Sequence, residues 1–280
     1  MLPKERMSET MKSIVITGSA RGLGYELAKA MIPYGYGVCL SDINEALLTE
    51  AKKSLEGLFP EAKIVAKAAN VAKKEDLEAL YLETEKEFGK VSVFVNNAGV
   101  NQRMVPLYEL EEKEIDLLLD VDLKGAMMGS LIAFKKMKEQ GFGQIYTIDG
   151  FGSNDAFRMG LNAYGTSKRA LTHFSHALAK ESEELGAKVL IGRLSPGIMI
   201  TNFVTHANED KTTMELPEKV KKVYNILGDY PDVVATFFAK KIASNSKNDV
   251  SFEWLTGAKA FHRFLHAKKY ASRDFFGDNK

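Results

Sequence analysis

The chain has 280 residues, of which 45% are hydrophobic, so it is long enough to bury a substantial core in one or two domains. Its 38 basic and 37 acidic side chains leave a formal charge of +1, which gives no indication of a nucleic-acid partner. The single cysteine, Cys39, excludes an intrachain disulfide framework and fits a reducing compartment, and the histidines form no metal-binding pattern with it.

The N-terminal segment is polar and charged. Residues 1–12 contain neither an apolar stretch nor a small-residue cleavage site, so they do not resemble a secretory signal. The chain has no apolar run of roughly 18 residues, and no membrane span is predicted. We therefore expect a cytoplasmic protein in which residues 1–10 form a loose extension.

The first predicted strand, 13–17, leads into the glycine-rich turn GSARGLG and then a helical stretch over 25–32. Strand, glycine-rich turn and helix in this order are typical of a dinucleotide-binding βαβ unit, although the glycine spacing is G-x-x-x-G-x-G. The pyrophosphate would bind free N–H groups at the start of the helix. The predicted cofactor contacts in this turn are Gly18, Ala20, Arg21, Gly22, Leu23 and Gly24.

An acidic residue, Asp42, follows the second predicted strand, 37–41. This is the distance expected of a carboxylate that binds the adenosine ribose hydroxyls, and it would repel a 2′-phosphate, which favours NAD. NADP stays possible because the Arg21 guanidinium could bind that phosphate. Alternatively, Asp42 caps the helix that begins near Asn44.

Strands and helices continue to alternate along the chain, which predicts an α/β fold: a Rossmann-type, doubly wound parallel sheet of about seven strands with helices on both faces. The further strands are expected at 63–69, 91–95, 144–148, 188–194 and 250–255. The further helices are expected at 45–59, 73–88, 161–185 and 231–243, and 107–140 is helix-rich. Small and amide residues at 70–71 and 96–99 end two of the strands and suit a ligand crevice, although turns favour the same residues.

Tyr164 and Lys168 are four residues apart in a predicted helix, so their side chains should share one face. An ammonium beside a phenol favours the phenolate, which would lower the tyrosine pKa below its usual value of about 10. Such a tyrosine could exchange a proton near neutral pH. The alternative is a buried aromatic side chain beside a lysine that only packs its stem.

Four motifs in this order resemble the short-chain dehydrogenase/reductase family over residues 13–201: TGSARGLG, NNAG, YGTSK and PGIMIT. The resemblance implies hydride transfer between NAD(P) and a carbonyl or alcohol, with Tyr164 as the acid/base and Lys168 on the nicotinamide ribose. No metal is implied. The further cofactor contacts that it implies are Asn70, Val71, Asn97, Ala98, Gly99, Pro196, Gly197, Ile198, Met199 and Thr201.

The sequence departs from the family pattern at two catalytic positions. The family usually places a serine near Asp149 and Gly150, and Ser153 is the nearest hydroxyl that could replace it. The family asparagine that fixes a proton-relay water corresponds to Asp122, which could hold that water. Alternatively, Asp122 pairs with Lys124 or ends a helix.

The loop DGFGS, together with YGTSK and LSPG, resembles the chlorophyll b reductase branch of the family. That branch is linked to NADPH, whereas Asp42 favours NAD. The likeness indicates that an enzyme can work with this loop, and it does not identify a pigment substrate.

We expect a single NAD(P)-binding domain over 1–280, with a substrate-side flap at 202–230 and a C-terminal helical tail at 257–280. The tail contains an amphipathic helix over 259–269, which is expected to pack on the body or another subunit, with a membrane surface as the alternative. By analogy with the family, the protein should form a homodimer or homotetramer.

The leading hypothesis is an NAD(P)-dependent oxidoreductase acting on a small-molecule carbonyl or alcohol. Two other hypotheses stay open: a catalytically degenerate dinucleotide sensor or scaffold, which the departures at Asp122 and Gly150 motivate, and a peripheral membrane enzyme.

Overall fold

The computed structural model describes residues 11–199, 218–273 and 275–276. Within these residues, seven parallel strands form one sheet in the order β3-β2-β1-β4-β5-β6-β7, which confirms the predicted fold class. The strands are β1 (Lys12–Thr17), β2 (Tyr36–Ser41), β3 (Ile64–Ala66), β4 (Val93–Asn96), β5 (Gly143–Ile148), β6 (Val189–Ser195) and β7 (Val250–Glu253).

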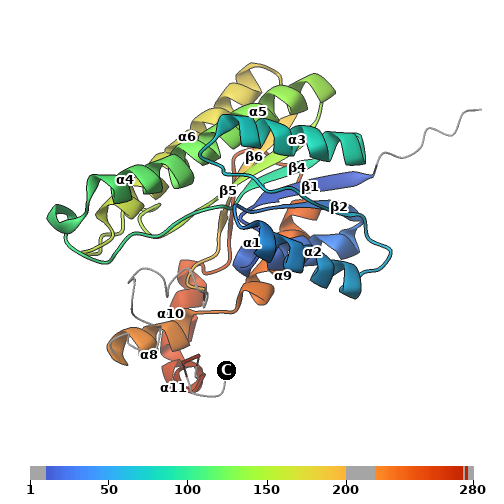
Figure 1. Ribbon diagram of the computed structural model, residues 1–280. Helices are drawn as coiled ribbons and strands as arrows, with labels where there is room; N and C mark the ends of the chain where they lie inside the picture. The colour runs from blue at the N-terminus through green and yellow to red at the C-terminus, as the bar shows by residue number, and fades with distance from the viewer. Residues whose placement is uncertain (1–10, 200–217, 274, 277–280) are drawn as a thin grey trace, which may run out of the picture.

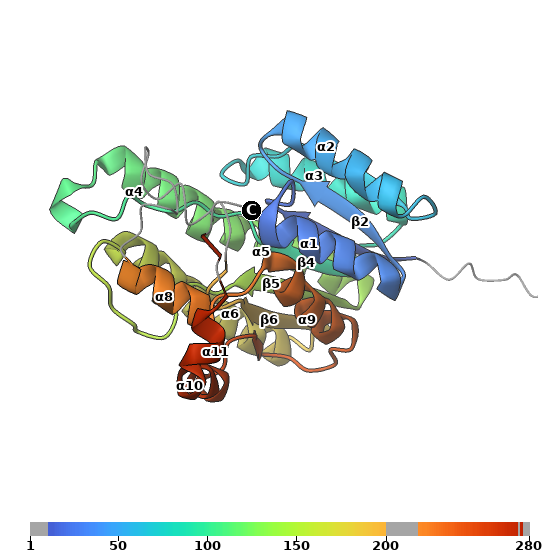
Figure 2. The same ribbon diagram turned by 90° about the horizontal axis from the view of Figure 1, so that it is seen from below.

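Helices cover both faces of the sheet (Figure 1; Figure 2). One layer contains α1 (Gly22–Met31), α2 (Glu45–Leu58) and α9 (Pro231–Ala243), and the other contains α3 (Lys74–Phe88), α5 (Ala126–Gln140) and α6 (Asn162–Glu184). Successive side chains of a strand point to opposite faces, so Ile14 and Ile16 pack in one core with Leu27, while Val15 packs in the other with Leu80. This explains why residues 14–17 of β1 are all β-branched.

The strand order reverses between β1 and β4, which are neighbours in the sheet although β2 and β3 separate them in the chain. Ile16 pairs with Val95, so the turns that follow the two strands meet at the same edge of the sheet. In open α/β sheets the carboxyl ends of the strands at such a switch form the ligand crevice. The fold therefore places the glycine-rich turn and the segment after β4 together.

The helix-rich region 107–140 is not one regular helix. A 3₁₀ turn η2 (Leu107–Glu109) and α4 (Glu112–Leu118) precede a π-helical turn η3 (Leu119–Gly125), which runs into α5. A π-helical turn changes the direction of the side chains that it carries, and such turns are frequent at functional sites.

The C-terminal tail bends around a buried carboxylate. The predicted helix 259–269 is instead α10 (Gly257–Leu265) and α11 (Ala267–Ala271), which lie with α8 (Glu218–Leu227) away from the sheet (Figure 1). Asp229 accepts from Trp254 Nε1 at 2.7 Å and pairs with Arg263 at 2.7 Å and Arg273 at 3.1 Å. A continuous helix would separate the two arginines by roughly 15 Å along its axis, so only the bend brings both onto Asp229.

The predicted extension 1–10 and residues 202–217 of the predicted flap lie outside the described residues. Within the ranges that are described, no helix combines the length and the apolar composition needed to cross a bilayer.

Candidate active site

The glycine-rich turn packs directly against the segment that follows β4. Gly18 has φ of +62°, and a Cβ there would lie 2.7 Å from Ala98 Cα. A Cβ at Gly24 would lie 2.6 Å from Asn97 Nδ2, which donates to the carbonyls of Thr17 and Gly18 at 2.8 and 2.9 Å. The close approach requires glycine at both positions, and the bonds of Asn97 hold the turn in place.

The N-terminus of α1 fits the phosphates of a dinucleotide. Among the described residues no side chain caps this helix, whose N-cap is Arg21, so its first N–H groups can bind an anion. Leu23 points into the core, which leaves only its backbone for such a contact. Asp42 lies beside the turn and accepts from the N–H of Ala20 at 3.3 Å.

The helix after Asp42 is capped by Asn44, whose side chain accepts from Leu47 N–H at 3.0 Å. The alternative in which Asp42 is the cap is therefore wrong. Asp42 Oδ1 instead accepts from Asn44 N–H at 3.1 Å, which orients the carboxylate at the end of β2. This position fits the predicted contact with a ribose.

The other predicted cofactor residues follow β3, β4 and β6 at the same edge of the sheet. Val71 packs against the π-helical turn, where a Cβ on Gly125 would lie 3.0 Å from Val71 Cγ2. Ile198 accepts from Asp229 N–H at 3.1 Å, so the segment after β6 is tied to the tail. The remaining described residues of this set are Asn70, Gly99, Pro196, Gly197 and Met199. Thr201 lies outside the described residues.

Tyr164 and Lys168 are both buried on one face of α6, as the spacing predicts. The Lys168 ammonium lies 5.5 Å from the centroid of the Tyr164 ring. It also lies 3.5 Å from the carbonyl oxygen of Ile148, at the end of β5. The side chains therefore meet where the central strands end.

Asp122 contacts the lysine directly. Its side chain is fully buried, and Oδ2 lies 3.1 Å from Lys168 Nζ. Oδ1 accepts from the N–H of Val100, which follows the NNAG motif, at 2.7 Å. The alternative of an Asp122–Lys124 pair is wrong, because Lys124 pairs with Asp120. Asp122 is buried in the π-helical turn, while its neighbours Val121 and Leu123 are half-buried.

The expected lowering of the tyrosine pKa is wrong for this structure. Burial raises the pKa of Tyr164, and although the Lys168 charge lowers it, the carboxylates of Asp122 and Asp149 raise it further. For Lys168, burial lowers the pKa, but the negative charge of Asp122 and its bond to the ammonium raise it and leave the pKa above its ordinary value. The site therefore combines a neutral phenol with a charged lysine.

Asp149 is a further buried carboxylate at this site, directly after β5. Burial raises its pKa, while the charges of Arg193 and Lys168 lower it. Arg193 Nη1 lies 3.6 Å from Asp149 Oδ2. The negative charge around Lys168 therefore comes from the carboxylates of Asp122 and Asp149.

The loop after β5 has no space for the serine that the family usually places there. A Cβ on Gly150 would lie 2.4 Å from Tyr164 Oη, closer than real Cβ contacts. Ser153 Oγ accepts from Gly150 N–H at 3.1 Å, so this hydroxyl sits on the turn that borders the tyrosine. The structure brings Ser153 to the edge of the site, and its catalytic role stays a prediction.

One buried side chain of the site was not predicted. Gln102 Oε1 accepts from Tyr164 N–H at 2.7 Å, across 62 positions of the chain. The only feature of the sequence that pointed to Gln102 was its amide side chain three residues after the NNAG motif. That feature does not reveal a contact with a residue so far along the chain.

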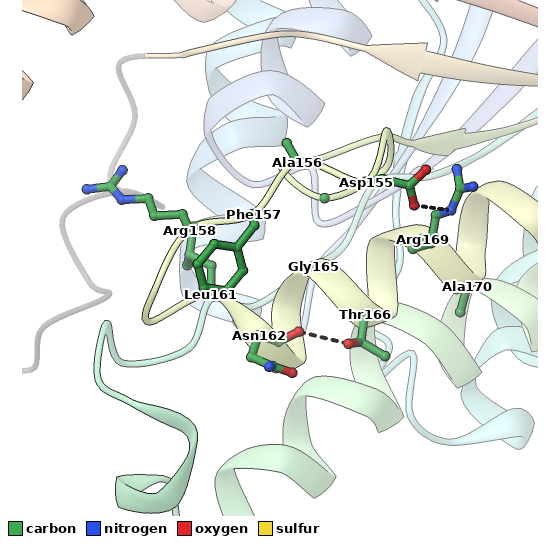
Figure 3. A pocket seen from close by; sticks show the side chains of 11 residues that line it. Asp155, Ala156, Phe157, Arg158, Leu161, Asn162, Gly165, Thr166, Arg169 and Ala170 are labelled. Atoms are coloured by element: carbon green, nitrogen blue, oxygen red, sulfur yellow. Dashed lines mark hydrogen bonds and ion pairs between the residues drawn. The ribbon is translucent and has the colours of Figure 1, made fainter.

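A cavity of about 460 Å³ lies between the segment 152–158 and the outer flank of α6 (Figure 3). Arg169 pairs with Asp155 at 3.0 Å across its edge, and Thr166 donates to the carbonyl of Asn162. The residues that line it include neither Tyr164 nor Lys168. The cavity is therefore separate from the buried Tyr164–Lys168 pair.

Comparison with known proteins identifies the class. Residues 12–212 match the short chain dehydrogenase family, and the chain belongs to this family. Members of this family are oxidoreductases that work with a nicotinamide cofactor on carbonyl and alcohol groups. The crystal structure of levodione reductase has the same fold, with a TM-score of 0.78, 22% identity, and coverage of 89% of this chain and 98% of that one.

Two relatives show which members of the family the sequence is similar to. A probable chlorophyll(ide) b reductase, NYC1, from Arabidopsis thaliana is 29% identical over 240 residues, which are 80% of this chain and 46% of the relative. A diacetyl reductase from Staphylococcus epidermidis is 30% identical over 205 residues, 73% of this chain and 77% of the relative. The likeness to the chlorophyll b reductase branch is confirmed, and the chain spans about half the length of its NYC1 relatives.

Proposed function

We propose that the protein reduces a carbonyl compound to an alcohol, with Tyr164 as the proton donor and Lys168 as the charge that stabilises the resulting phenolate. The observation that carries this proposal is the buried Tyr164–Lys168 pair at the edge of the sheet where the uncapped helix α1 begins. A bound nicotinamide cofactor supplies the hydride. The turn after β1 and Asp42 would hold its adenosine half, and Lys168 its second ribose.

The charge distribution favours reduction over oxidation at neutral pH. Burial keeps the pKa of Tyr164 above its ordinary value, so the group is a neutral phenol that can donate a proton to a carbonyl oxygen. Lys168 stays charged beside it. Oxidation of an alcohol needs the phenolate as a base and should require a more alkaline solution.

Tyr164→Phe tests the acid/base assignment. Because general acid catalysis contributes about 10²–10⁴-fold, kcat should fall by about that factor, while the cofactor Kd should change little. Tyr146→Phe is a matched control, since it removes another buried hydroxyl, one that donates to Gln144 at 2.6 Å far from the site. Full activity of Tyr164→Phe would overturn the assignment.

We propose NAD as the preferred cofactor because the Asp42 carboxylate lies beside the glycine-rich turn and would repel a ribose 2′-phosphate bound there. Titration should give a lower Kd for NADH than for NADPH. In Asp42→Asn the two Kd values should lie closer together. Tighter binding of NADPH to the unmodified protein would mean that Arg21 governs the choice instead.

The substrate class should be sought with the likeness to relatives as a guide. A panel that contains both diacetyl and chlorophyllide b covers the compounds named for the relatives. Dinucleotide binding without turnover on such a panel would support the sensor hypothesis instead.

The predicted oligomer and location need separate tests. Light scattering tests the homodimer or homotetramer, and cell fractionation tests the cytoplasmic location.

A further inference from the structure

We propose that Gln102 is a positioning residue, which holds Tyr164 in place through its backbone and links the cofactor-side segment to the helix of the catalytic pair. This inference rests on the proposed function of Tyr164. Gln102 follows the NNAG motif and belongs to none of the four motifs that define the family resemblance.

The carboxamide of Gln102 is buried and uses both of its ends. The residue is 4% exposed. Oε1 accepts from Tyr164 N–H at 2.7 Å, while Nε2 donates to the carbonyl of Gly160 at 2.7 Å and to that of Arg103 at 3.4 Å. A group that accepts from one backbone and donates to another is required here, and a carboxamide meets both needs.

The hydrogen bond from Tyr164 N–H to Gln102 lies in the first turn of α6. The first N–H groups of a helix have no partner within it, and the N-cap of α6, Leu161, offers no side-chain hydrogen bond. Tyr164 lies in this first turn, and its N–H is one of the groups left over. Gln102 caps it from a distant segment, and through Gly160 it also fixes the glycine before the helix, which has φ of +85°.

The same segment supports the other half of the pair. Val100 N–H donates to Asp122, and Asp122 lies 3.1 Å from the Lys168 ammonium. Backbone and side-chain bonds from residues 100–102 therefore reach both Tyr164 and the partner of Lys168. This segment continues directly from Gly99, so its bonds to Tyr164 and to Asp122 both begin next to a predicted cofactor contact.

Gln102→Met tests the proposal, since it keeps the size of the side chain and removes both polar functions. Misplacement of a reacting group by about 1 Å can cost about 10²-fold in rate, so kcat should fall by about 10- to 100-fold. The cofactor Kd should stay within about threefold of that of the unmodified enzyme, because no cofactor contact is removed. The assay is single-turnover reduction of a substrate from the panel, at saturating NADH or NADPH.

Gln140→Met is the matched control. Gln140 Nε2 donates to the carbonyls of Val91 and Phe142 at 2.8 and 2.6 Å, at the opposite edge of the sheet from Tyr164. The Gln140→Met variant loses hydrogen bonds to backbone carbonyls, as Gln102→Met does, and it should leave kcat unchanged. Equal losses of kcat in the two variants would overturn the positioning role, because they would show a general effect of lower stability.

Gln102→Glu and hydrogen exchange give readouts that a merely structural residue would not produce. Glu keeps the acceptor for Tyr164 N–H and loses the donor to Gly160, so Gln102→Glu should have a higher kcat than Gln102→Met.

Exchange of the Tyr164 amide hydrogen should be faster in Gln102→Met and unchanged in Gln140→Met. Unchanged exchange and kcat in Gln102→Met would refute the inference. Loss of activity in Tyr164→Phe with no effect of Gln102→Met would leave the proposed function standing and this inference refuted.

Discussion

Asp122 lies beside the lysine of the catalytic pair, and Asp122→Asn should make Tyr164 a stronger acid. The carboxylate is 3.1 Å from the Lys168 ammonium, which is 5.5 Å from the Tyr164 ring centroid, so the carboxylate lies within about 9 Å of the ring. The charge of a phenolate lies on Oη, about 3 Å from the ring centroid, so at an effective dielectric constant of about 20 the repulsion between a phenolate and Asp122 is at least about 1.4 kcal/mol. Asn is the suitable replacement, because its Oδ1 can still accept from Val100 N–H.

The sign of the effect follows from which form is charged. Asp122 raises the pKa of Tyr164 by disfavouring the phenolate, so its removal lowers that pKa. At a fixed pH below the pKa, about 1.4 kcal/mol corresponds to roughly tenfold more phenolate. Alcohol oxidation, which needs the phenolate, should therefore become faster near neutral pH, and the alkaline limit of carbonyl reduction should move to lower pH.

The assay is kcat/KM measured against pH in both directions, with Lys124→Gln as a control that changes a nearby exposed charge pair. If the profile of Asp122→Asn moves to higher pH or does not move, the electrostatic reasoning is refuted. A shift to higher pH would show that Asp122 acts chiefly by keeping Lys168 charged, because burial alone lowers the lysine pKa.

Two further variants test the geometry. Gly150→Ser restores the serine that the family usually has, yet its Cβ would lie 2.4 Å from Tyr164 Oη. We expect kcat to fall roughly tenfold or more, and a gain in activity would contradict the packing argument. Asp229→Asn leaves the buried Arg263 without its charged partner and should lower the free energy of unfolding by about 3 kcal/mol in urea titrations. A loss below about 1 kcal/mol would show that the tail is held by its other contacts.

The order of elements and the edge of the sheet that carries the site could be predicted from the sequence. Continuous β-branched strands such as 13–17 indicate burial on both faces, and their alternation with helices leaves a parallel sheet as the arrangement. The spacing of Tyr164 and Lys168 determines that they share a face of α6, because helical periodicity is a local property.

Contacts between distant segments could not be predicted in the same way. Asp122 faces Lys168 because a π-helical turn changes its direction, and no local pattern distinguishes that turn from a regular helix. The tail bends at His266 because two arginines converge on Asp229, which is a tertiary constraint.

The sequence by itself determined the fold class, the family motifs and the Tyr–Lys pair, since each depends on short-range order or on residues that stand close in the chain. Only the tertiary structure decided the electrostatics of the pair. The pKa of Tyr164 depends on burial and on carboxylates from two other elements, Asp122 and Asp149, and these terms outweigh the neighbouring lysine. The contact of Gln102 was also decided by the tertiary structure, because its bond to the Tyr164 backbone joins residues 62 positions apart in the chain.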